Sequence, residues 1–126
     1  MNKAILAARV LLGAIFFVFG LNFWFGFFDV PPPPEGSASA FMGALYGSGF
    51  LTAVKVLELA GGLALLIKRT ALGLVLLGPV IINILFYDVF LSQAFNPVAV
   101  VSAVLAMFLL IDERDRFLPL FGKGRA

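Results

Sequence analysis

Hydrophobic residues fall into four long runs, which polar residues and prolines separate. The runs predict helices at about residues 4–28, 50–67, 71–91 and 95–112. A helix needs about 20 residues to cross a hydrocarbon core of roughly 30 Å. The first and third runs reach that length and the second nearly does, whereas the fourth needs a thinner bilayer or burial against its neighbours. The pattern predicts an all-α, integral membrane four-helix bundle formed by a single transmembrane domain over residues 1–126.

The segment at residues 29–49 differs from the other connections. It contains four consecutive prolines, Pro31–Pro34, which favour an extended polyproline strut over a helix. The following stretch, ASAFMGALY at residues 38–46, has an apolar face and predicts a short amphipathic helix with Ser37 or Ser39 as its N-cap. This extra helix is expected either to lie in the membrane interface or to act as a lid over a cavity.

The remaining connections are short. Residues 68–70 leave room only for a tight hairpin between the second and third helices. Asn96 followed by Pro97 has the pattern of an N-cap followed by proline at the first helical position. A charged tail occupies residues 113–126.

Basic residues outside the apolar runs are confined to one side of the predicted membrane. That side would hold Lys3, Lys68, Arg69, Arg114, Arg116, Lys123 and Arg125, whereas the loops at residues 29–49 and 92–96 contain no Lys or Arg. Cytoplasmic loops are enriched in Lys and Arg. The sequence therefore predicts a multi-pass protein with both termini in the cytoplasm.

Composition supports the membrane class and narrows the chemistry. The chain is 62% hydrophobic and only 13% charged, whereas soluble domains carry about 25% charged residues. It contains no Cys and no His, so disulfides, Cys or His metal sites and His-based catalytic triads are excluded within it. A net charge of +2, without a basic patch interleaved with aromatics, argues against nucleic acid as a partner.

Four ionisable residues interrupt the apolar runs at membrane depth: Arg9, Lys55, Glu58 and Asp88. Each would cost about 2.5–3.5 kcal/mol at the centre of a membrane helix, so they should face the interior and find partners. Their expected depths favour pairing of Lys55 with Asp88 and of Arg9 with Glu58. Lys55 and Glu58 can also meet directly, because they are three residues apart on one helix.

Other residues suggest which helix faces are inward. Gly13, Gly20, Gly61 and Gly62 share stripes with the charges, and small residues let membrane helices approach closely. In the third helix, Pro79 is expected to cause a kink that opens room beside Asn83 and Tyr87. The candidate ligand-binding or buried polar site between helices 1–3 thus comprises Arg9, Lys55, Glu58, Asn83, Tyr87 and Asp88. Asn22 and Trp24 are expected to be headgroup anchors.

The chain resembles the DoxX-like family of small four-helix bacterial membrane proteins. The resemblance rests on ARVLLGAIFFVFGLN in the first helix, FMGALYGSGFL after the proline-rich loop, VLELAGGLALL in the second helix and LGPVIINILFYDVFL in the third. Arg9, Glu58 with Gly61 and Gly62, and Pro79 with Asn83 occupy positions similar to the family pattern. Many relatives have His at the position of Asp88, so chemistry that needs an imidazole would be absent here or would use the carboxylate instead.

The resemblance implies a bacterial inner-membrane location and a link to membrane redox systems, in which some relatives are quinone-reducing subunits. One hypothesis is therefore an accessory or quinone/lipid-binding subunit of a redox complex, with no intrinsic cofactor and with quinone or lipid as the candidate ligand. A second hypothesis is a non-enzymatic adaptor or assembly factor, in which the intramembrane charges only fix helix register. A third is a proton or small-solute transporter. The sequence assigns no catalytic residue, and its partners would be the lipid bilayer, a redox-complex subunit or a second copy of the chain.

Overall fold

The computed structural model describes residues 2–125, and every regular element within that range is helical. The elements are, in chain order, α1 (Lys3–Phe25), α2 (Ser37–Ser48), α3 (Phe50–Leu66), α4 (Thr70–Phe86), the π-helix η1 (Tyr87–Ser92), α5 (Pro97–Asp112), α6 (Arg114–Phe117) and the 3₁₀-helix η2 (Leu118–Phe121).

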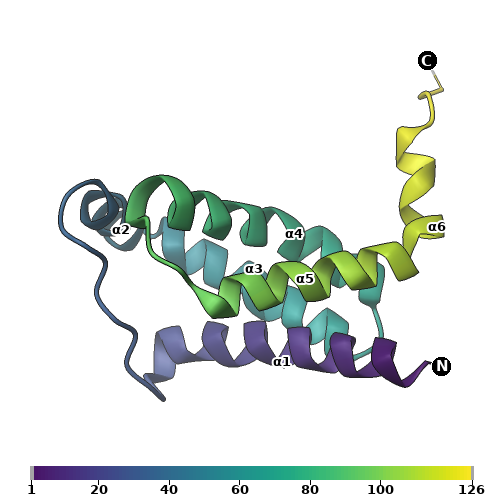
Figure 1. The fold of residues 1–126 in the computed structure, drawn as a ribbon, viewed down its shortest axis with the longest axis horizontal. Helices are drawn as coiled ribbons and strands as arrows, with labels where there is room; N and C mark the ends of the chain where they lie inside the picture. Colours follow the sequence, from purple (N-terminus) through teal and green to yellow (C-terminus); the bar gives the residue numbers. More distant parts are fainter. Residues whose placement is uncertain (1, 126) are drawn as a thin grey trace.

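Four of these helices form the bundle shown in Figure 1. Helix α1 packs against α3 and α5, and α4 packs against the same two helices, so the four enclose one common core. Thr70–Ser92 and α1 are long and apolar enough to cross a membrane. Helices α2 and α3 would add a third span if counted together, although they are bent by 82° at their junction. The predicted all-α membrane bundle with a short extra helix is confirmed.

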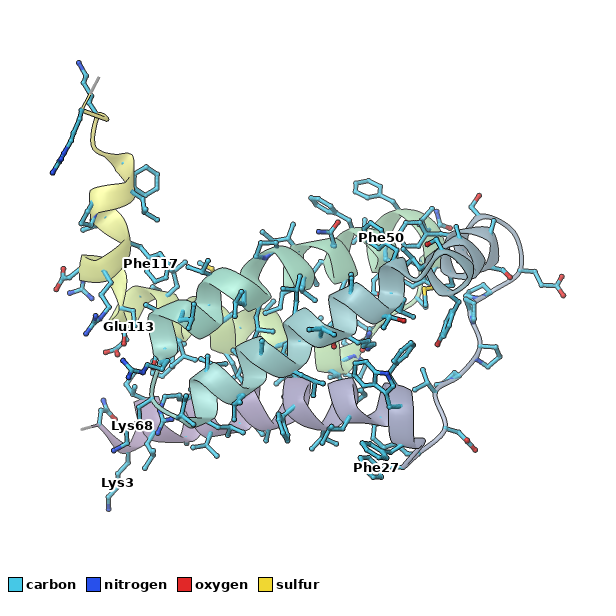
Figure 2. The ribbon with its side chains drawn as sticks, turned by 180° about the vertical axis from the view of Figure 1, so that it is seen from behind. Lys3, Phe27, Phe50, Lys68, Glu113 and Phe117 are labelled. Atoms are coloured by element: carbon cyan, nitrogen blue, oxygen red, sulfur yellow. The ribbon has the colours of Figure 1, made fainter. Side chains whose placement is uncertain are left out.

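The two ends of the bundle differ in composition. Lys3, Lys68 and Glu113 lie at one end, and Phe27 and Phe50 lie at the opposite end (Figure 2). We call the first the terminal end, because both chain termini lie there, and the second the proline end, because the polyproline strut connects α1 to α2 there (Figure 1).

Glycines set the contact between α1 and α3. A Cβ atom placed on Gly62 would lie 2.8 Å from the carbonyl oxygen of Gly13 and 2.8 Å from the amide nitrogen of Phe17. A Cβ atom on Gly20 would lie 2.9 Å from the side chain of Leu59. Only glycine permits such backbone approach, so the expectation that the glycine stripes face inward at close contacts is confirmed.

The contact between α3 and α4 depends on two further glycines. A Cβ atom on Gly61 would lie 2.5 Å from the side chain of Leu77, and one on Gly73 would lie 2.7 Å from that of Leu65. Leu65 and Leu77 are fully buried. Each glycine therefore provides the hollow into which a core leucine of the neighbouring helix packs.

Helix α1 ends three residues earlier than the apolar run predicts. Gly26 adopts a left-handed conformation with φ of 62° and ends the helix. Asn22, which is buried, then accepts a hydrogen bond from the amide of Phe28 at 2.9 Å. The sequence-based assignment of Asn22 as a headgroup anchor is therefore wrong, because its side chain closes the turn after α1.

The N-caps of α2 and α5 can also be compared with those that the sequence predicts. The N-cap of α2 is Gly36, without a side-chain cap hydrogen bond, so neither Ser37 nor Ser39 has the predicted capping role. Ser37 is instead the first residue of the helix. At α5, the predicted cap is confirmed, because the Asn96 side chain accepts a hydrogen bond from the amide of Ala99 at 3.3 Å and Pro97 follows it.

Candidate functional site

A cavity of about 650 Å³ lies at the proline end of the bundle. Its walls come from α1, α3, α4, η1, α5 and the polyproline strut, and they are mainly apolar. Four of the six predicted site residues line it: Lys55, Glu58, Tyr87 and Asp88. The structure therefore brings together the charged pair of α3 and the two polar residues that follow α4.

Lys55 and Glu58 form an ion pair across one turn of α3. The ammonium nitrogen of Lys55 lies 3.3 Å from each carboxylate oxygen of Glu58. The Glu58 side chain is 5% exposed and that of Lys55 is 21% exposed. This is the local contact that the three-residue spacing predicts. The pair leaves Lys55 with further N–H donors at the cavity wall, since an ammonium group has three.

Tyr87 and Asp88 are the first two residues of η1, which continues α4 with a wider helical turn. The apolar run predicts an ordinary α-helix here, and π-helical turns are rare but frequent at functional sites. Asp88 is half-buried and forms no ion pair with any residue in the range 2–125. The predicted pairing of Lys55 with Asp88 is wrong, because Lys55 is bound to the neighbouring Glu58 on its own helix.

Helix α2 and the strut form part of the wall of this cavity. The rings of Phe41 in α2 and Tyr87 in η1 are 5.8 Å apart, and Met42 together with Pro31–Pro34 lines the cavity. Helix α2 packs against α3 and η1. Of the two expectations for this helix, the arrangement favours a cover over the cavity.

Arg9 lies outside the cavity and does not pair with Glu58. Its guanidinium Nη1 donates to the carbonyl of Leu65, and to that of Leu66 at 3.2 Å. These carbonyls belong to the last turn of α3, where helix geometry leaves carbonyls unsatisfied and the helix dipole is negative. The predicted Arg9–Glu58 pair is therefore wrong, because Arg9 is level with the end of α3, about 10 Å along the axis from Glu58.

A family model described as DoxX matches residues 4–87, which is about two thirds of the chain. The chain belongs to the DoxX family. The match covers α1 to α4 and ends at Tyr87, so it includes the Lys55–Glu58 pair but neither Asp88 nor α5. No curated protein and no solved structure matches the chain.

Asn83 is the second predicted site residue that this DoxX protein does not place at the cavity. It is exposed on the outside of the bundle, and its side-chain amide donates to the carbonyl of Pro79 at 2.7 Å. The Asn83–Tyr87 spacing predicts a shared face, but Tyr87 lines the cavity and Asn83 does not. Compared with the site predicted from the sequence, the cavity therefore lies closer to η1 and α5.

Several cavity residues of this DoxX protein were missed by sequence reasoning. Ser102 and Ala99 of α5 are buried and line the cavity. Asp29 and the prolines of the strut also line it. Ser102 is the one polar side chain between Pro97 and Ile111, and that isolation could have identified it. The strut gave no comparable indication, because a polyproline segment can lie anywhere its length allows.

Proposed function

We propose that this DoxX family protein holds a quinone or a lipid-like molecule in its proline-end cavity and serves as an accessory subunit of a membrane redox system. The observation that supports this is the combination of a cavity of about 650 Å³ with mainly apolar walls and one cluster of polar side chains. Small-molecule sites usually enclose about 300–1,000 Å³ and fix an apolar ligand with a few polar groups. A quinone ring with an isoprenoid chain has this division of polar and apolar parts.

Lys55 and Tyr87 would supply the hydrogen bonds to the ligand. Both line the cavity, and both can donate to a carbonyl oxygen. Glu58 is held beside Lys55 and Asp88 is half-buried in the same cavity, so either carboxylate could exchange a proton with a reduced quinone. Electrons would come from a partner subunit or from a cofactor bound by one.

The test is a binding measurement on delipidated protein in nonionic detergent. Short-chain ubiquinone and menaquinone analogues should raise the thermal unfolding midpoint of the wild type. Tyr87→Phe and Lys55→Met should weaken that response, because each removes a donor that lines the cavity. Asn83→Leu provides the control, since it removes an exposed polar side chain of α4 that does not line the cavity.

Two outcomes would separate this proposal from the alternatives. If neither analogue binds, and a partner protein co-purifies equally well with wild type and with Glu58→Gln, the adaptor hypothesis replaces the ligand site. If the protein raises proton or solute flux in liposomes and Glu58→Gln abolishes that flux, the transporter hypothesis replaces it. Analogue binding that Asn83→Leu weakens as much as Tyr87→Phe would place the ligand elsewhere.

A further inference from the structure

A second hollow lies at the terminal end of the bundle, far from the cavity described above. It encloses about 260 Å³ and lies between the turn from α3 to α4 and the start of the C-terminal tail. Its lining includes three basic side chains and one acidic side chain: Lys68, Arg69, Arg116 and Glu113. Nothing in the proposed quinone or lipid site uses these residues.

The charges around this hollow are unbalanced. Glu113 is bound to Nε of Arg116 at 2.8 Å, which leaves the other donors of that guanidinium free for a second partner. Neither Lys68 nor Arg69 forms an ion pair with any other residue between positions 2 and 125. The hollow therefore presents an excess of positive charge with unused hydrogen-bond donors, which suits a phosphate group.

The turn that carries Lys68 and Arg69 is held in one conformation. The amide of Arg69 donates to the carbonyl of Ala64 at 2.7 Å, and that of Lys68 donates to Leu65 at 3.3 Å. Lys68 has a φ of 68°, a left-handed conformation that is unfavourable for a residue with a Cβ atom. Two adjacent cations are thus presented on a backbone tied to the last turn of α3.

Exposed apolar side chains flank the cations along the chain. Ile67 and Leu72, which flank the turn, are both more than half exposed. Leu118, Leu120 and Phe121 lie two to five residues after Arg116 and are 58%, 74% and 87% exposed. Figure 1 shows this C-terminal segment turning away from α5 and projecting sideways from the end of the bundle. A soluble anion would need the cations but not this apolar surface.

We propose that the terminal-end hollow binds the phosphate headgroup of an anionic phospholipid. Lys68, Arg69 and Arg116 would contact the phosphate, while Leu118, Leu120 and Phe121 would enter the acyl boundary beside it. Basic residues next to apolar side chains at a membrane surface bind anionic lipids in this way. The tail continues with Lys123 and Arg125, which add positive charge on the same segment.

The experiment titrates the full-length protein in nonionic detergent with phosphatidylglycerol or with phosphatidylcholine and follows the thermal unfolding midpoint. Phosphatidylglycerol should raise the midpoint at lower concentration than phosphatidylcholine. The Lys68→Gln/Arg69→Gln variant should require about tenfold more phosphatidylglycerol for the same rise, because it loses two headgroup contacts. The control Lys3→Gln/Lys123→Gln removes the same charge outside the hollow. It should shift the requirement clearly less than the Lys68→Gln/Arg69→Gln variant, because only general attraction to the anionic surface is lost.

Three results would overturn the proposal. Equal losses in the two double variants would show that net charge, rather than the hollow, attracts the lipid. Inorganic phosphate or soluble glycerol phosphate that stabilises the protein as well as phosphatidylglycerol would identify a free phosphate site. Equal responses of the unfolding midpoint to the two lipids would show that the hollow does not bind an anionic headgroup. Glu58→Gln should leave the response to phosphatidylglycerol unchanged, so that this test does not depend on the quinone-site proposal.

Discussion

The two halves of the bundle differ in the surroundings of their charged side chains. Towards the terminal end, Gly13 and Gly62 bring α1 and α3 into backbone contact, and Arg9 is enclosed between them with its donors on α3 carbonyls. Towards the proline end, the helices leave a cavity of about 650 Å³, and the Lys55–Glu58 pair lies on its wall. The first half uses a charge to complete a helix end, whereas the second leaves charged groups beside a space that a ligand can fill.

This contrast separates structural from functional candidates within one DoxX chain. Intramembrane ionisable residues are functional by default because of the cost of burying them. Arg9 is an exception, since its hydrogen bonds to Leu65 and Leu66 account for its position without a ligand. Lys55 and Glu58 pair with each other, but together with Tyr87 and Asp88 they also line the cavity, so these four are the candidates for contact with a ligand.

The largest effect is expected where the two helices touch. Gly62→Leu should lower the free energy of unfolding by about 3 kcal/mol, because even a Cβ atom there would lie 2.8 Å from backbone atoms that cannot move independently. Denaturant titration in detergent micelles measures the change. Gly78→Leu is the matched control, since a Cβ atom on Gly78 meets nothing within 4 Å. Equal losses at the two positions would contradict the close packing of α1 on α3.

The second effect concerns the pair on the cavity wall. Lys55→Met should cost about 2 kcal/mol, because it strands the Glu58 carboxylate, although partial exposure of the pair moderates the penalty. Adding Glu58→Leu should restore part of this stability, since the double variant has no unpaired charge. The same micelle titrations give the coupling free energy, expected at about 1 kcal/mol or more. Losses that simply add would mean that the ion pair does not form in the membrane protein.

A third, smaller effect tests the position of Arg9. Arg9→Leu should cost about 1–2 kcal/mol, because the Leu66 carbonyl loses its donor and the Leu65 carbonyl keeps only its backbone donors. The loss is moderated because Nε of Arg9 is itself buried without a partner among residues 2–125. In combination with Glu58→Leu, the two losses should add within about 0.5 kcal/mol, because the residues share no contact. A double variant that regains stability would instead support the Arg9–Glu58 pair suggested by their expected depths.

The sequence allowed more of the fold to be predicted than of the site. Apolar runs and glycine stripes specify helices and close contacts directly, and the Asn96–Pro97 cap follows from local chemistry. The partners of Arg9 could not be predicted in the same way, because every residue has a carbonyl and no side-chain pattern marks those of Leu65 and Leu66. The Lys55–Glu58 contact could be predicted, since it depends only on spacing along one helix.

The end of α4 shows a further limit. An apolar run ending in LFYDVFL gives no indication that Tyr87–Ser92 form a π-helix. The wider turn changes the direction of the side chains that follow it, so an ideal helical repeat misjudges which residues share a face. Asn83 lies before this turn, because the amide of Tyr87 still donates to the Asn83 carbonyl as in an α-helix. The structure leaves Asn83 outside the predicted site, since its side chain is exposed and donates to the carbonyl of Pro79.

Substitution of Asn83 has the smallest expected effect, and it tests whether the ligand site extends to the outer face of α4. Asn83→Leu removes only an exposed side-chain hydrogen bond to Pro79, so stability should change by no more than about 0.5 kcal/mol. Binding of quinone analogues should not change either, because Asn83 does not line the cavity. Thermal shifts with and without analogue measure both quantities on one sample. A selective loss of analogue binding, with stability retained, would show that the ligand reaches the outer face of α4. Asn83 would then belong to the binding site, as the sequence predicts.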